Sequence, residues 1–296
     1  MTSSQPFTQE EDLNQPLSAK RTWFDRGMTL LAFVLTAIAL LPLFSIIIEI
    51  LRQGIGQLTL ESLVSLPAPV GVEDEPNGFA NAIVGTLVMV GIAALISVPF
   101  GVMTGIFLSE VGKTRKISQG IRFVIVILSS VPSVIFGVFA YGVIVLTTKQ
   151  FSAVAGGFAL SMIMLPIVAL TTEEALKLVP QSYRLASAAL GGTRPQGIFK
   201  IIMPAALPAI TTGVLLAVAR AAGETAPLMF TALFSQFWPD GLMSPTPSMP
   251  VLIYTYASSP FKEQNQMAWT AALVLLMMVL ISNILSRVVT QKRLKS

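Results

Sequence analysis

Long runs of apolar residues, separated by shorter polar segments, dominate the pattern of this chain. The apolar positions do not alternate with polar ones at the period of an amphipathic strand or helix. Each run is long enough to cross the hydrocarbon core of a membrane, which takes about 20 residues in a helix. The pattern predicts an all-α integral membrane protein with six transmembrane helices. The predicted spans are residues 28–50, 80–108, 121–146, 151–170, 207–234 and 267–288.

Composition supports a membrane protein and excludes most membrane enzymes. Charged residues make up 11% of the 296 residues, against about 25% in a soluble domain. The chain has no Cys and no His, so Ser-His and Cys-His catalysis, thiolate or imidazole metal sites and disulfides are excluded. One deep carboxylate is also too few for an aspartyl-type dyad. We therefore expect no catalytic residue, no metal and no cofactor.

The basic residues predict the orientation, because Lys and Arg near membrane spans stay on the cytoplasmic side. If the N-terminus is cytoplasmic, 15 of the 19 Lys and Arg residues lie inside, three lie outside, and Arg220 lies within a span. Both termini are therefore predicted to be cytoplasmic. Residues 1–27 read as a polar, disordered tail without the features of a signal peptide, residues 28–288 as the transmembrane domain, and residues 289–296 as a basic tail.

If this membrane protein is a transporter driven by ATP, another subunit has to supply the ATPase. The sequence lacks G-x-x-x-x-G-K-[ST], the loop that cradles nucleotide phosphates, so a partner subunit would hydrolyse ATP. A self-sufficient channel or secondary transporter is the alternative, but it would need several charged or unwound sites in repeated halves.

The cytoplasmic loop at residues 171–206 is the segment most suited to contact such a partner. It predicts a helix over residues 172–179, broken at Pro180, and a second helix that ends at Gly191 and Gly192. Thr193 can then cap a third helix with Pro195 in its first turn. An amphipathic hairpin lying on lipid headgroups is the alternative interpretation.

The spacing in this loop resembles the signature of type I ABC importer permeases, an E-A-A element followed by a Gly and then by I-x-L-P. The matching residues are Leu185, Ala186 and Ser187, then Gly191, then Ile201, Ile202, Met203 and Pro204. Leu185 stands where the family has Glu. An ionic contact from that Glu to the ATPase therefore cannot be carried over to this chain. The resemblance implies ATPase coupling through packing and basic side chains. The coupling residues so implied are Arg184, Ala186, Ser187, Gly191, Gly192, Arg194, Ile201, Met203 and Pro204.

Arg220 and Glu224 are charged residues within the fifth predicted span. An ionised group near the bilayer midplane costs at least about 2.5 kcal/mol on insertion scales, so such groups turn inward and pair. Their i, i+4 spacing predicts one helix face. Arg offers a planar fork of donors suited to phosphate or carboxylate oxygens, which favours an anion pathway; a purely structural ion pair is the alternative.

Ser130 and Ser133 flank Pro132 in the third predicted span. Their hydroxyls, with Thr225 next to Glu224 in the fifth span, are candidate contacts of a passing oxyanion. The alternative is that serines beside a proline kink bond the carbonyls of their own helix.

Three segments together resemble the PstA family of phosphate ABC transporter permeases, which have a MetI-like transmembrane domain. They are RAAGETAPL (residues 220–228), LSSVPSVIFG (128–137) and NAIVGT (81–86). The resemblance implies phosphate import across the bacterial inner membrane. It also implies a PstC-like second permease, a PstB-like ATPase dimer and an extracytoplasmic, PstS-like phosphate-binding protein as partners, with membrane lipid around them and no nucleic acid. Sulfate and molybdate remain alternative substrates.

Overall fold

The computed structural model describes residues 19–69, 71, 76–112 and 116–295, and all regular structure in these ranges is helical. The chain divides into two units, Met1–Glu49 and Ile50–Ser296. Five helices in the described ranges are long and apolar enough to cross a membrane, and a bent helix pair would make a sixth. Six spans are therefore available by length and composition, as the sequence predicts.

The first unit holds most of α1 (Ala19–Gly54), which has Pro42 inside it. Residues 1–18 of the predicted tail lie outside the described residues. The helix nevertheless begins nine residues before the predicted span, at Ala19. Ala, Lys and Arg are good helix formers, so the helix continues into the polar segment where the apolar run has not yet begun.

In the second unit, α3 (Ala80–Ile106), α7 (Ala153–Lys177), α10 (Met203–Ala222) and α13 (Lys262–Lys295) form the bundle. Small residues let α3 approach α7 closely. A Cβ atom at Gly105 would lie 2.6 Å from Cβ of Thr172, and one at Gly101 would lie 2.8 Å from Cβ of Val168. The G-x-x-x-G spacing of the second span therefore serves helix packing.

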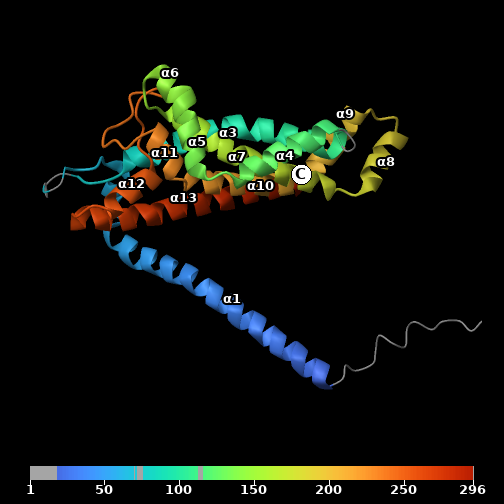
Figure 1. Cartoon of the computed structure of the whole chain (residues 1–296), viewed down its shortest axis with the longest axis horizontal. Helices are drawn as coiled ribbons and strands as arrows, with labels where there is room; N and C mark the ends of the chain where they lie inside the picture. Colours follow the sequence, from blue (N-terminus) through green and yellow to red (C-terminus); the bar gives the residue numbers. More distant parts are fainter. Residues whose placement is uncertain (1–18, 70, 72–75, 113–115, 296) are drawn as a thin grey trace, which may run out of the picture. The chain divides into compact units, whose positions relative to one another are not determined.

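The shorter elements connect these helices along the chain. Between α1 and α3 lie η2 (Ile55–Gln57) and α2 (Leu60–Val64), and between α3 and α7 lie η3 (Phe107–Val111), α4 (Lys116–Ser130), α5 (Ser133–Ala140), η4 (Tyr141–Val145) and α6 (Leu146–Thr148). Between α7 and α10 lie α8 (Gln181–Ala189), α9 (Arg194–Gly197) and η5 (Ile198–Ile202), and α11 (Ala226–Thr231) and α12 (Met249–Ala257) precede α13. The segments η3, η4 and η5 are π-helical. In Figure 1, α4 lies beside α7, whereas α8 and α12 lie at opposite ends of the bundle.

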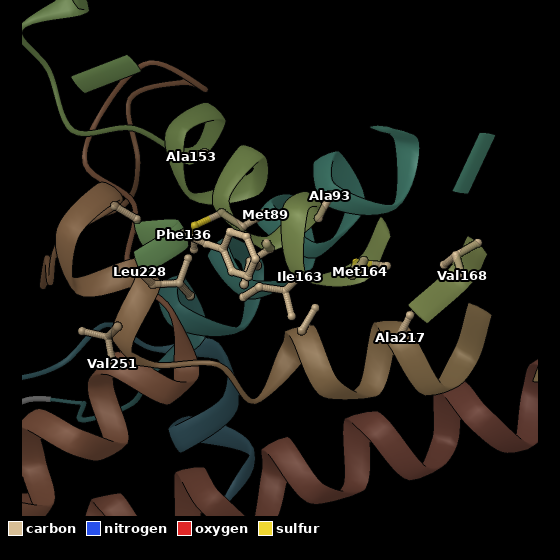
Figure 2. Packing of buried hydrophobic residues seen from close by; sticks show 13 residues of the cluster. Met89, Ala93, Phe136, Ala153, Ile163, Met164, Val168, Ala217, Leu228 and Val251 are labelled. Atoms are coloured by element: carbon tan, nitrogen blue, oxygen red, sulfur yellow. The ribbon is translucent and has the colours of Figure 1, made fainter. Parts of the chain in front are cut away.

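The main hydrophobic core lies where α3, α5, α7, α10 and α11 meet. Figure 2 shows Phe136 of α5 and Leu228 of α11 in one cluster with Met89 of α3 and Ile163 of α7. The helices on either side of each break in the third and fifth spans are therefore held by the same core.

The third predicted span is not one straight helix. The axes of α4 and of the helical segment Ser133–Thr148 differ by 101°, and Val131 and Pro132 lie between them. Pro132 has no N–H to donate and disfavours a helical conformation at Val131. Residues 121–146 thus form a broken span or a re-entrant loop.

The fifth predicted span is also broken. The helix α10 ends at Ala222, Gly223 forms its C-cap, and α11 begins at Ala226 with Pro227 in its first turn. Continuous helix over residues 207–234 was the wrong expectation, because Gly at a C-cap and Pro at a helix start together favour an interruption.

The fourth span and the first predicted helix of the cytoplasmic loop are a single helix. The helix α7 continues from Ala153 to Lys177, so no helix break separates the predicted span from the loop helix that follows it. Its polar residues do not mark a helix end, because Thr172 and Glu173 are buried against neighbouring helices. Likewise the predicted basic tail continues α13 as far as Lys295.

The NAIVGT segment holds the long connection between α11 and α12. The side-chain amide of Asn81 donates to the backbone oxygens of Ser235 and Phe237, both at 3.2 Å. The backbone N–H of Met249 donates to the hydroxyl of Thr86 at 2.8 Å. A Cβ atom at Gly85 would lie 1.9 Å from the backbone oxygen of Pro247. This segment therefore has a structural role, fixing residues 235–249 on the start of α3.

Candidate functional site

Arg220 lies in the last turn of α10, and Glu224 lies just beyond the end of that helix. The Nε atom of Arg220 is 3.7 Å from Oε1 of Glu224, and the two side chains are 56% and 17% exposed. The pair predicted from the sequence is thus present, but the helix break, and not one continuous helix face, brings the two groups together. At 3.7 Å the ion pair is too long for a hydrogen bond, which leaves the guanidinium donors available to an anion.

A small pocket joins Arg220 to the third span. It has a volume of about 20 Å³ and is lined by Arg220, by Ser129 and Ser133 on either side of the Pro132 kink, and by Pro166 of α7. This is room for about one water molecule, so the pocket is closed to a tetrahedral oxyanion in this conformation. The remaining lining residues are apolar: Leu128, Val131, Phe136, Ile163 and Ile167.

The predicted pathway residues separate into two groups. Ser133 lines the pocket with Arg220, whereas Ser130, Glu224 and Thr225 do not. The Ser130 hydroxyl donates to the backbone oxygen of Val126 at 2.9 Å, within its own helix. This is the alternative role that the sequence left open. Thr225 stands at the start of α11 without a side-chain capping bond.

The breaks in the third and fifth spans pack directly on each other. A Cβ atom at Gly137 would lie 2.6 Å from Cα of Pro227 and 3.0 Å from its backbone oxygen. Only a glycine allows α5 and α11 to approach this closely. The segments 128–137 and 220–228, far apart in sequence, therefore form one structural unit around the pocket.

The loop at residues 171–206 has the two short helices around a glycine turn that the sequence predicts. Gly191 has a φ of +76°, which disfavours any residue with a Cβ. The backbone N–H of Thr193 donates to the Gln196 side chain at 3.0 Å in a capping box that starts α9. Both helices lie at one end of the bundle, and α12 lies at the other (Figure 1).

The side chains of this loop face in different directions. Leu185 and Leu190 are 64% and 88% exposed, and Ala186, Gly191 and Arg194 are exposed as well. Ser187 is buried against Gly192. The backbone N–H of Gly192 donates to the backbone oxygen of Ser187 at 3.0 Å. We call the exposed set Leu185, Ala186, Leu190 and Arg194 the docking surface.

The last predicted coupling residues lie where the loop joins α10. Ile201 and Met203 are half-buried and Pro204 is exposed, while Ile202 between them is buried. Ile202 packs with Ala175 and Leu176 of α7. These contacts fix the start of α10 on the end of α7.

Arg184, predicted as a coupling residue, is bonded mainly within the chain. Its Nη2 donates to Oε1 of Glu110 at 2.6 Å and to the backbone oxygen of Leu176 at 2.9 Å. Its Nη1 donates to the backbone oxygen of Val179 at 2.7 Å, and the side chain is 15% exposed. The hydrogen bonds to Glu110 raise the pKa of Arg184. The sequence does not indicate this pair, because Glu110 lies 74 residues before Arg184 in the chain.

Sequence reasoning also missed a buried carboxylate near the end of α7. The Glu173 side chain is 1% exposed and forms ion pairs with Arg122 of α4 and with Lys177 of α7. The signal was available, because an acidic residue that follows an apolar run without a helix break needs a cationic partner.

Comparison with known proteins places this geometry in a family. The family model described as "Binding-protein-dependent transport system inner membrane component" matches residues 97–295. The phosphate transport system permease protein PstA of Haemophilus influenzae is 42% identical over 264 residues, which cover 89% of this chain and 92% of that protein. The chain belongs to the PstA family of permeases. The probable phosphate transport system permease protein PstA of Methanocaldococcus jannaschii is 38% identical over 258 residues, covering 86% of this chain and 90% of that protein.

Solved structures share the fold at low sequence identity. A chain of a bacterial alginate ABC transporter in complex with its periplasmic protein has a TM-score of 0.60 at 17% identity, covering 92% of this chain and 96% of that chain. A chain of the methionine transporter MetNI in an inward-facing conformation has a TM-score of 0.56 at 18% identity, covering 72% and 93%. The fold is that of a type I ABC importer permease, and the chain is a multi-pass membrane protein.

Proposed function

We propose that this chain is the permease subunit of an ATP-driven importer of inorganic phosphate in the inner membrane of a bacterium, with both termini cytoplasmic. It forms the translocation pathway with a PstC-like second permease, receives phosphate from an extracytoplasmic PstS-like binding protein, and couples to a PstB-like ATPase dimer. The chain itself catalyses no reaction. The observation that carries the substrate assignment is the convergence of Arg220 and Ser133 on one pocket between two broken spans, in a chain of the PstA family.

The chemistry of this pocket suits an oxyanion. Arg220 supplies a permanent positive charge and several N–H donors, and Ser133 supplies a hydroxyl. Glu224, at 3.7 Å, offsets part of the Arg220 charge, so an anion is attracted but still released. An entering phosphate competes with Glu224 for the guanidinium, which favours passage over tight binding.

The docking surface is the proposed contact with the ATPase. Leu185 replaces the acidic residue of the E-A-A element, and Leu190 adds further exposed apolar area, so packing is the main contribution and Arg194 adds the charge. Arg184 holds this surface in place from inside the chain.

The experiment that tests this function is ATP-dependent uptake of radiolabelled phosphate into liposomes containing this chain and its three kinds of partner. Arg220→Ala should abolish uptake while the complex still assembles. The matched control is Lys20→Ala, which removes an exposed basic side chain at the start of α1 and should leave uptake unchanged.

Three outcomes would contradict the proposal in different ways. Normal uptake by Arg220→Ala would make the ion pair structural. Competition by sulfate or molybdate at concentrations equal to phosphate would reassign the substrate. Uptake by this chain without ATP or partners would favour a channel or secondary transporter.

A further inference from the structure

Glu173 forms an ion pair that neither the pocket nor the docking surface uses. Its carboxylate is buried near the end of α7 and contacts the Arg122 guanidinium on α4 and the Lys177 ammonium at 2.9 Å. Lys177 lies one turn away on the same helix, so that contact joins α7 only to itself. The contact with Arg122 joins two helices.

The helices α4 and α7 run antiparallel from this ion pair to the pocket. Arg122 faces Glu173 at one end, and Ile125 packs with Ala169 one turn further on. Ser129 of α4 and Pro166 of α7 then both line the pocket. Both Arg122–Ser129 and Glu173–Pro166 are steps of seven residues, two helical turns or about 10 Å. One face of α4 therefore follows one face of α7 from the ion pair to the Arg220 pocket.

The same end of α7 holds the cytoplasmic loop. Arg184 of α8 donates to the backbone oxygens of Leu176 and Val179, at 2.9 and 2.7 Å. Leu176 follows Glu173 by three residues, less than one turn. A displacement of α8 therefore acts on the turn of α7 that carries Glu173.

Between its start and the pocket, the other contacts of α4 are hydrophobic. Its buried residues are Ser118 and Ile125, while Ile121 and Leu128 are half-buried against neighbouring hydrophobic clusters. The 101° bend separates the axis of α4 from that of the segment Ser133–Thr148. Hydrophobic contacts through these side chains are non-directional, whereas a charge-assisted hydrogen bond to a guanidinium fixes both position and orientation.

We propose that Arg122 and Glu173 are a positioning pair that makes α4 move with α7 when the ATPase displaces α8, so that the Ser129 wall of the Arg220 pocket opens and closes with the ATP cycle. This inference rests on the proposed function and adds to it the route by which the coupling loop reaches the pocket. Without the pair, α7 moves without α4. ATP is still hydrolysed, but the pocket does not open in step with its hydrolysis.

The test measures phosphate imported per ATP hydrolysed by the complete transporter in liposomes. Arg122→Gln and Glu173→Gln should each lower this ratio at least tenfold while ATP hydrolysis continues. The double variant should lower this ratio no further than either single variant, because each single variant already removes the same interaction. Arg122→Lys keeps a cation and should recover most of the ratio. Lys177→Gln is the matched control: it removes a cation from the same carboxylate without separating α4 from α7, and its ratio should equal that of the wild type.

A covalent rescue tests the pair independently of charge. The chain contains no Cys, so Arg122→Cys with Glu173→Cys gives a unique thiol pair in this subunit. Joining the thiols with a bis-methanethiosulfonate reagent of the length of an Arg–Glu pair should restore the ratio that the unlinked variant loses.

The remaining outcomes separate the inference from the proposed function. Wild-type complex without ATP-dependent uptake would overturn the proposed function. Wild-type uptake together with an unchanged ratio in Arg122→Gln would overturn the positioning role alone. A parallel loss of uptake, hydrolysis and thermal stability that cross-linking does not reverse would reduce the pair to a structural contact and likewise overturn it.

Discussion

Two oxygens of Glu110 hold the Arg184 guanidinium at 2.6 and 3.1 Å, in the fork geometry that makes such pairs strong. The side chains are 7% and 15% exposed, so each charge depends on the other for its solvation. Glu110 lies in η3 at the end of α3, and Arg184 lies in α8. This residue pair thus links α8 of the loop at residues 171–206 to the end of the second span.

We expect Glu110→Ala to destabilise the protein by about 3–5 kcal/mol, since it leaves a mostly buried guanidinium without its counter-charge. Thermal unfolding of the purified chain in detergent measures the loss. Glu174→Ala is the control: the Glu174 side chain is 68% exposed and pairs with Lys177 at 2.8 Å, and such a surface pair contributes less than about 1 kcal/mol. Equal shifts in the two variants would contradict the anchoring role of Arg184.

At the scale of elements, residue types predicted where helices exist better than where they break. The runs that form α3 and α13 were recognisable from apolar length alone. Pro132 and Gly223 were visible as kink-forming residues, but a Pro inside a helix can also be tolerated, as Pro99 is inside α3. What decides a break is the packing around it. The sequence could not show that Gly137 and Pro227 meet, because that contact joins segments 90 residues apart.

This contact makes a prediction about the two broken spans. Gly137→Val should separate α5 from α11, because even its Cβ would overlap Cα of Pro227. Overpacking of this kind costs about 1–3 kcal/mol, and the displaced wall should also lower phosphate uptake. Gly142→Val, in η4 of the same span, is the matched control, since nothing lies within 4 Å of its Cβ position. If both variants fold and transport alike, the two breaks do not depend on each other.

At the scale of the whole molecule, the sequence was sufficient to predict the fold class and the family. It was insufficient to predict which charged residues are internal and which are exposed. Apolar run length fixes the membrane spans, and motif spacing carried the resemblance that the PstA relatives confirm. Arg184 and Arg194 could not be told apart in sequence, yet one is internal and the other exposed. Their difference depends on Glu110, which only the folded chain brings near.

An exposed leucine in the loop at residues 171–206 argues for a partner that covers it. Leu190 is 88% exposed at the end of α8, and burying a leucine side chain is worth about 1.5–3 kcal/mol. Leu190→Asp should therefore leave the stability of the isolated chain unchanged and weaken its association with the ATPase at least tenfold, measured by titration of the ATPase onto the permease pair in detergent. Leu242→Asp makes the same change at a leucine that is 54% exposed, in the connection before α12. The α12 end of the bundle lies away from α8 (Figure 1), so this control should retain wild-type affinity. Unchanged affinity in Leu190→Asp would remove this leucine from the interface, whereas an equal loss in both variants would point to a general effect of added charge.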